Sequence, residues 1–155
     1  MASELIAPIV EDLRKSDNRM DIIKGIEKLN VKDEPITAAV KAKVPVLEMG
    51  DWLIKTGSGL DLPGAGAVAN TFPVWVGLDQ YDAQATQHAT ILISGGFIYR
   101  TTKFSIAAGA LPIGSNLTVK LAGVPELAGV GDPVLARVYT AADAAGVMEI
   151  QVLDR

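Results

Sequence analysis

The chain has 155 residues, with 14 Lys and Arg against 18 Asp and Glu, which gives a formal charge of −4 at neutral pH. This length suits one domain with a sizeable core, and the acidic balance argues against nucleic-acid partners, which require clustered basic residues. The absence of cysteine excludes thiol nucleophiles, CxxC redox chemistry and zinc ribbons, and the single His88 excludes multi-histidine metal sites.

Charge and glycine divide the sequence near Thr56. Residues 1–55 hold 9 basic and 10 acidic residues and 2 glycines, whereas residues 56–155 hold 5 basic and 8 acidic residues and 13 glycines. We therefore expect a helical N-terminal arm or subdomain over residues 1–45 and an antiparallel β domain over residues 46–155. No continuously apolar run is long enough to span a membrane, and the opening MASEL has no basic region before an apolar run, so we expect neither a membrane partner nor a secretory signal.

The N-terminal part has the spacing of two short amphipathic helices. A first helix is predicted from Leu5, Ile6, Ile9, Val10 and Leu13, with Pro8 a possible first residue. Ser16, Asp17 and Asn18 offer capping oxygens for a second helix, whose apolar face would hold Ile22, Ile23, Ile26 and Leu29. Helices of this length are marginal alone, so they must dock on their own domain or on a partner.

After Pro45 the sequence changes to short β-branched or aromatic runs separated by glycine-containing turns. Eight strands are predicted, at residues 44–49, 51–56, 72–78, 89–95, 97–106, 116–122, 133–140 and 147–154. Gly95-Gly96 has the composition of a hairpin turn, and residues 143–146 should turn the last two strands back on each other. Eight strands without interspersed helices predict a mainly β fold, an antiparallel barrel or sandwich.

The motifs that could carry chemistry are weak. The glycine-rich residues 57–66 lack the Lys-Ser/Thr of a phosphate-binding loop and are interpreted as a loop or arm. Other candidates are a cation site from Asp79, Asp82 and His88, a serine nucleophile at Ser94 or Ser105, and a carboxylate pair chosen from Asp61, Asp79, Asp82 and Asp132. None has the spacing that its chemistry requires. We therefore expect no catalytic residues, no metal site and no cofactor.

The eight aromatic residues allow two interpretations. A barrel could line a ligand groove with some of them, which would make the protein a small-ligand or carbohydrate-binding module. Their positions inside strand patterns favour core packing instead. The predicted β domain carries few charges, which also suits large interfaces with other proteins, because the centres of such interfaces are depleted of charge. Assembly is therefore the favoured function, with the ligand-binding module as the alternative and an enzyme of unrecognised type as a third possibility.

The C-terminal sequence resembles a known class of proteins. The runs LPIGSNLTVKLAG (111–123) and ELAGVGDPVLARVYTAADAAGVMEIQVLD (126–154) resemble capsid decoration, or cement, proteins and related virion β domains of tailed bacteriophages. AVANTFPVWVG (67–77) and the alternating ATILISGGFIYRT (89–101) fit the same style. The resemblance implies a homo-oligomeric structural protein, made in the host cytoplasm, that binds the major capsid protein on the outer capsid surface and stabilises the shell.

The N-terminal segment suggests where such a protein would attach. The apolar residues proposed to contact the partner are Leu5, Ile9, Leu13, Ile22 and Ile26, because helices without their own core must bury them on something. Deletion of residues 1–45 should then leave a folded β domain that binds its assembly poorly.

Overall fold

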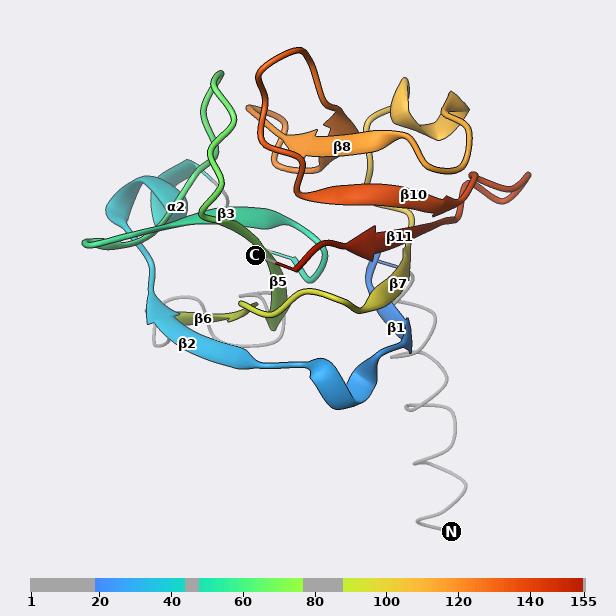
Figure 1. Cartoon of the computed structure of the whole chain (residues 1–155). Helices are drawn as coiled ribbons and strands as arrows, with labels where there is room; N and C mark the ends of the chain where they lie inside the picture. Colours follow the sequence, from blue (N-terminus) through green and yellow to red (C-terminus); the bar gives the residue numbers. More distant parts are fainter. Residues whose placement is uncertain (1–18, 44–47, 77–87, 155) are drawn as a thin grey trace, which may run out of the picture.

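The computed structural model describes residues 19–43, 48–76 and 88–154, which form two antiparallel β-sheets (Figure 1). The six-stranded sheet has the order β1-β7-β11-β10-β8-β9. Its strands are β1 (Asp21–Lys24), β7 (Ile98–Thr101), β8 (Asn116–Val119), β9 (Pro125–Leu127), β10 (Ala136–Thr140) and β11 (Met148–Val152). Neither sheet closes, so the predicted mainly β antiparallel class is confirmed, and the two sheets indicate a sandwich.

The second sheet has five strands in the order β2-β6-β5-β3-β4. These are β2 (Val31–Pro35), β3 (Trp52–Thr56), β4 (Gly59–Asp61), β5 (Thr71–Val76) and β6 (His88–Leu92). The sheet curls, and its two edges approach where Ile36 and Leu60 form an isolated bridge and Thr37 N donates to Leu60 O at 3.0 Å. The helix α2 (Ala38–Lys43) follows, and its Val40 is buried.

The core consists of two clusters of buried residues. The larger lies on the inner face of the six-stranded sheet and includes Trp52, Phe97 and Tyr99, which confirms core packing for these three aromatic residues. The smaller belongs to the curled five-stranded sheet and includes Val40, Leu60 and Ile91. Two separate clusters follow from the curl, because the second sheet encloses apolar side chains of its own as well as contributing Trp52 to the shared core.

The last hairpin forms as predicted. Asp143 Oδ1 accepts hydrogen bonds from the backbone N of Ala145 at 2.9 Å and of Val147 at 3.0 Å, and Gly146 takes a φ of +77°. The turn brings β10 and β11 into antiparallel pairing. Met148, Ile150 and Val152 are buried while the residues between them are half-buried, so the alternation in the sequence does set the faces of β11.

The predicted hairpin at Gly95-Gly96 is wrong. The strand before it, β6, pairs with β2 and β5, whereas the strand after it, β7, pairs with β1 and β11. The two glycines instead carry the chain from one sheet to the other. Gly96 has a φ of +79°, and a side chain at Gly95 would collide with the backbone carbonyl of Leu153. Glycine is needed here for a close crossing of two backbones.

The second predicted N-terminal helix is also wrong. Its residues form β1 and then the short 3-10 helix η2 (Ile26–Lys28), separated by Gly25 at a φ of +79°. Pairing with β7 decides the conformation, because tertiary contacts readily override a helical spacing of apolar residues. The chain before the predicted boundary at residue 45 thus supplies an edge strand to each sheet, and deletion of residues 1–45 would remove both.

Smaller differences concern the remaining elements. The strands β2, β4 and β9 and the helix α2 were not predicted, and β4 lies inside the glycine-rich stretch interpreted as a loop. The predicted strand at residues 97–106 ends at Thr101 and is followed by the 3-10 helix η4 (Ala108–Ala110). Within the predicted strand at 44–49, Met49 lies in a turn and residues 44–47 are outside the described part. Among the described residues, no helix is long and apolar enough to cross a membrane.

Candidate functional site

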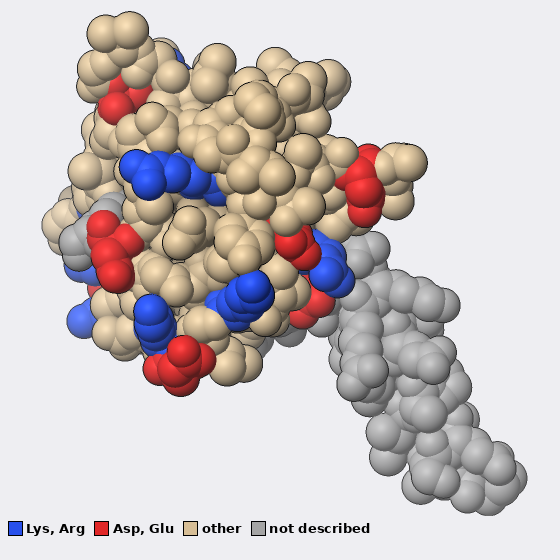
Figure 2. Space-filling model, turned by 45° about the vertical axis from the view of Figure 1, so that its right-hand side comes forward, with Lys and Arg blue, Asp and Glu red and all other residues tan. Residues whose placement is uncertain are grey.

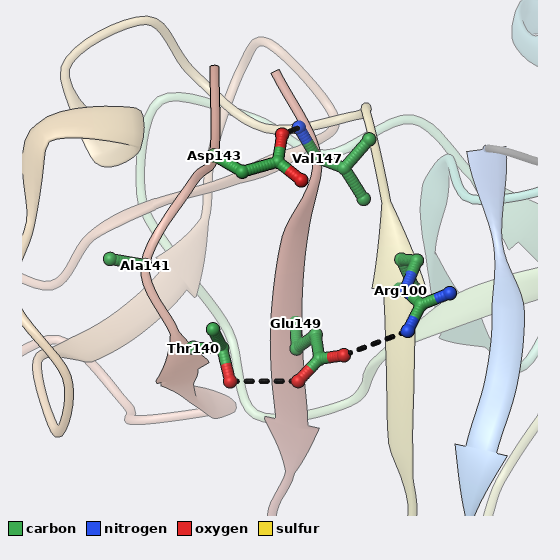
Figure 3. Close-up of a pocket in the computed structure, with 6 residues that line it drawn as sticks. All are labelled: Arg100, Thr140, Ala141, Asp143, Val147 and Glu149. Carbon is green, nitrogen blue, oxygen red and sulfur yellow. Dashed lines mark hydrogen bonds and ion pairs between the residues drawn. The ribbon is translucent and has the colours of Figure 1, made fainter. Parts of the chain in front are cut away.

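A pocket of about 340 Å³ opens beside the turn between β10 and β11 (Figure 3). Three strands of the six-stranded sheet meet there: β7 contributes Arg100, β10 ends at Thr140, and β11 contributes Glu149. The turn itself completes the lining with Ala141, Asp143 and Val147. The register places Arg100 directly opposite Glu149, so sheet pairing brings the two charges together.

Glu149 is the centre of the polar contacts in this pocket. Its carboxylate accepts a hydrogen bond from Thr140 Oγ1 at 2.7 Å and contacts the Arg100 guanidinium at 3.1 Å. The hydrogen bond from Thr140, followed by the contact with Arg100, lowers the pKa of the Glu149 carboxyl below its ordinary value of 4.5. Burial opposes this shift. The carboxylate is therefore ionised at neutral pH and held by two partners.

The other polar side chains in and near the pocket also have hydrogen-bond partners. Asp143 is bonded to the backbone of its own turn, as Figure 3 shows for Val147. The nearby Lys24 donates from Nζ to Tyr139 Oη at 2.8 Å, and this hydrogen bond raises the pKa of the lysine. Nucleophilic catalysis needs a nucleophile with a base in reach, and a ligand site needs polar groups that face the ligand. The polar side chains that line this pocket instead bond to one another or to the backbone.

A second polar cluster lies where the described chain begins. Lys103 Nζ contacts Glu48 and Asp51, each at 2.9 Å, and Arg19 contacts Glu48 at 3.6 Å. Burial acts to lower the pKa of Lys103, but its hydrogen bonds to Asp51 and Glu48 outweigh burial and raise it. The hydrogen bond from Lys103 lowers the pKa of Glu48. This cluster joins residue 19 to the start of β3, and its charges neutralise one another.

The predicted partner contacts fall in different environments. Ile22 lies on β1, is half-buried, and packs against the larger core cluster of its own chain. Ile26 is 68% exposed on η2. Leu5, Ile9 and Leu13 are outside the described residues. The structure thus separates the two described members of this set, because β1 turns one inward while η2 leaves the other in solvent.

The described residues among those singled out for weak chemical motifs have structural partners or are exposed. Ser94 Oγ accepts from Asn30 N, and Ser105 Oγ accepts from Ala108 N at the start of η4. Asp61 accepts from Thr37 Oγ1 and from Leu62 N, while Asp132 contacts Lys120 at 2.8 Å. His88 is exposed at the start of β6, and Asp79 and Asp82 lie outside the described residues. Within the described ranges, no group of three or more His, Cys, Asp or Glu could hold a metal ion.

Several exposed aliphatic side chains lie in the region around β8 and β9, at one edge of the six-stranded sheet. They are Ile106 (98% exposed), Ile113 (70%), Leu121 (64%), Leu127 (52%) and Val130 (109%). Sequence reasoning did not single out these residues. A signal was present, because residues 104–135 contain three charged residues, Lys120, Glu126 and Asp132.

Backbone pairing places four of these residues around β8 and β9. Leu127 lies on β9, which pairs with β8, and Ile113 and Leu121 occupy the turns at the two ends of β8. The loop that carries Val130 leaves β9 where Ala128 N bonds Asn116 O and returns where Leu135 N bonds Leu117 O, so it crosses β8. In Figure 1 this loop arches above β8, and the corresponding upper part of Figure 2 carries few charged side chains.

No model of a known protein family matches the sequence, and no curated protein gives a significant match.

Proposed function

We propose that the protein is a structural virion protein that binds the outside of an assembled phage capsid and stabilises it by bridging major capsid subunits. The proposal starts from the resemblance of residues 60–154 to capsid decoration proteins and related virion β domains. The observation that supports it most is the low charge of the β domain, residues 46–155. Most of its described charged side chains form ion pairs within the chain. Examples are Lys120 with Asp132 at 2.8 Å and Arg100 with Glu149 at 3.1 Å.

A surface of this kind suits contact with other proteins. The centres of protein interfaces are depleted of charged residues, because desolvating an unpaired charge is unfavourable. A decoration protein would bury such surface at several junctions of the capsid at once, so modest individual contacts would become strong through multivalency. Attachment would then depend on apolar burial more than on ion pairs.

The ligand-binding alternative has less support among the described residues. A sugar or small-ligand module would present aromatic side chains in an accessible mouth. Trp52, Phe97 and Tyr99 are buried in the larger core cluster, and Trp75 and Phe104 pack against it. The pocket at the β10–β11 turn is lined by paired polar groups and by Ala141 and Val147.

The direct test is to purify virions of the phage whose genome encodes this sequence. Quantitative mass spectrometry should find the protein at a copy number comparable with that of the major capsid protein, and cryo-electron microscopy should place it on the outer shell. Because screening by about 1 M salt weakens ion pairs but not apolar burial, a wash at that concentration should leave it bound. Absence from purified virions, or a place inside the shell or in the tail, would overturn the proposal.

A further inference from the structure

One cation of the β domain differs from the others. Among the described basic residues of positions 46–155, Arg137 has no ion pair, whereas all the others do; these are Lys55, Arg100, Lys103 and Lys120. Arg137 lies on β10 and is exposed. If a partner covers this surface, the guanidinium needs an opposite charge from that partner, because desolvating an unpaired charge is unfavourable.

Strand register places Arg137 in a row of side chains across the outer face of the six-stranded sheet, the face turned away from the larger core cluster. Ala136 and Val138, on either side of Arg137, belong to that cluster, so the arginine side chain points the other way. Directly opposite residues of antiparallel strands share a face. The row therefore consists of Lys24, Ile98, Gln151, Arg137 and Asn116. It contains two cations and no carboxylate.

The strands that flank β10 offer Arg137 no free carboxylate. β8 has no acidic residue, and Glu149 is the one acidic residue of β11. Figure 3 shows that Glu149 is bonded to Arg100, at 3.1 Å, and to Thr140, at 2.7 Å. The positive charge of Arg137 is thus left uncompensated by its neighbours in the sheet.

The Arg137 guanidinium is held in position while some of its donors remain available. Arg137 Nε donates to Asn116 Oδ1 at 3.1 Å. This bond leaves the Nη groups of the arginine and the NH₂ group of the asparagine as donors on the same face. A planar guanidinium can donate two parallel hydrogen bonds to the two oxygens of a carboxylate. Because Asn116 orders the side chain beforehand, binding loses less conformational entropy.

We propose that Arg137, positioned by Asn116, binds the carboxylate of an Asp or Glu side chain on the major capsid protein. The identity of the partner rests on the proposed function, whereas the chemistry of the contact rests on the unpaired guanidinium. Apolar burial would supply most of the affinity, and this pair would fix the orientation of the protein on the shell. A pair covered by the partner is screened far less than an exposed one, so the contact is compatible with retention in salt.

Competition for places in the virion tests the proposal with the full chain. Cells that express a variant are infected with the phage that encodes the unchanged chain, and mass spectrometry compares the two forms in virions and in the soluble pool. Arg137→Glu should enter virions at less than about one-tenth of its share of the pool. Arg137→Lys should be depleted at least about threefold, because an ammonium keeps the charge but cannot donate the two parallel bonds.

The matched control is Lys32→Glu, which makes the same change of net charge at an exposed position on β2, in the other sheet. It should enter virions in proportion to its share of the pool. Thermal unfolding should be alike in the unchanged chain and the variants, because Arg137 and Lys32 are exposed. If Arg137→Glu folds poorly, Arg137→Lys provides the same test with the charge retained.

The outcomes separate this proposal from the proposed function. Arg137 variants that enter virions in proportion to the pool would overturn the carboxylate contact and leave the capsid assignment standing. Absence of the unchanged chain from virions would overturn both. If Arg137→Lys is incorporated like the unchanged chain, the partner offers only a diffuse negative charge, and the carboxylate contact fails. It also fails if Arg137→Glu loses only self-association in sedimentation, because the carboxylate then belongs to a second copy of the chain.

Discussion

Replacement of Tyr99 by phenylalanine should destabilise the fold through one lost hydrogen bond. Tyr99 is fully buried on β7, and its hydroxyl accepts the Trp52 Nε1–H at 3.2 Å. The substitution keeps the ring, which lies 6.2 Å from the Phe97 ring, so apolar packing changes little. It leaves the Trp52 N–H buried without a partner, because Trp52 itself is 1% exposed.

The expected magnitude follows from this unpaired donor. A buried group that loses its hydrogen-bond partner destabilises a protein by about 1–3 kcal/mol. For a chain of this size, that corresponds to a decrease of about 2–12 °C in Tm. Urea unfolding should show a lower midpoint with an unchanged slope, since the surface exposed on unfolding is the same.

The matched control is Tyr139→Phe. The Tyr139 hydroxyl accepts from Lys24 in an exposed position, where water can replace the lost bond. This variant should lie within about 0.5 kcal/mol of the unchanged protein. The reasoning is refuted if Tyr99→Phe is as stable as the unchanged protein, or if both variants lose the same amount.

Tyr99 also predicts how stability changes at high pH. Burial raises the pKa of the Tyr99 phenol above its ordinary value of 10.0. Above pH 10 the unfolded chain therefore loses this proton while the folded chain keeps it, so the free energy of unfolding falls as the pH rises. Tyr99→Phe should lose less stability between pH 9 and pH 11 than the unchanged protein, measured from urea midpoints.

Three further predictions concern the crossing between the sheets and the β10–β11 turn. Gly95→Ala should destabilise by about 3 kcal/mol or more, because the new methyl group meets the Leu153 carbonyl, whereas Gly64→Ala, in open space, should be nearly neutral in thermal unfolding. Asp143→Ala removes two hydrogen bonds of the turn and should lower stability by about 1–2 kcal/mol in urea; an unchanged midpoint would contradict the role of this side chain. The lowered pKa of Glu149 means that its contribution is present above pH 4.5 and lost as the pH falls below that value. Glu149→Gln should therefore flatten the acid side of the stability profile, and an unaltered profile would count against the contacts described.

The composition and alternation of neighbouring residues predicted many of the strands. The strands β3, β5, β6, β7, β8, β10 and β11 fall within or close to predicted segments, because β-branched composition and alternation are properties of neighbouring residues. The turn at residues 143–146 was predicted for the same reason, since Asp143 acts on residues two and four positions away.

The errors arise where distant pairing decides the structure. Ile22 and Ile23 fit a helical spacing, and nothing near them in sequence reveals that Ile22 lies opposite Tyr99 on β7. Gly95-Gly96 can make a hairpin, but the sheet that each flanking strand joins is set by partners elsewhere in the chain. The pocket could not be predicted for the same reason, because it gathers residues from three strands and a turn.

The position of β1 and β2 at the sheet edges has a consequence for synthesis of the chain. β1 pairs with β7, where Asp21 lies opposite Arg100, and β2 pairs with β6, where Val31 lies opposite Leu92. At roughly 5–20 residues per second, a ribosome needs roughly 3–16 s to make the partners after the first strands have emerged. During that interval β1 and β2 have no sheet to join, and the six-stranded sheet cannot be completed until β11, which lies between β7 and β10, has been made. The nascent chain must therefore keep β1 and β2 from pairing wrongly until β6 and β7 have been made, and β11 completes the six-stranded sheet only later.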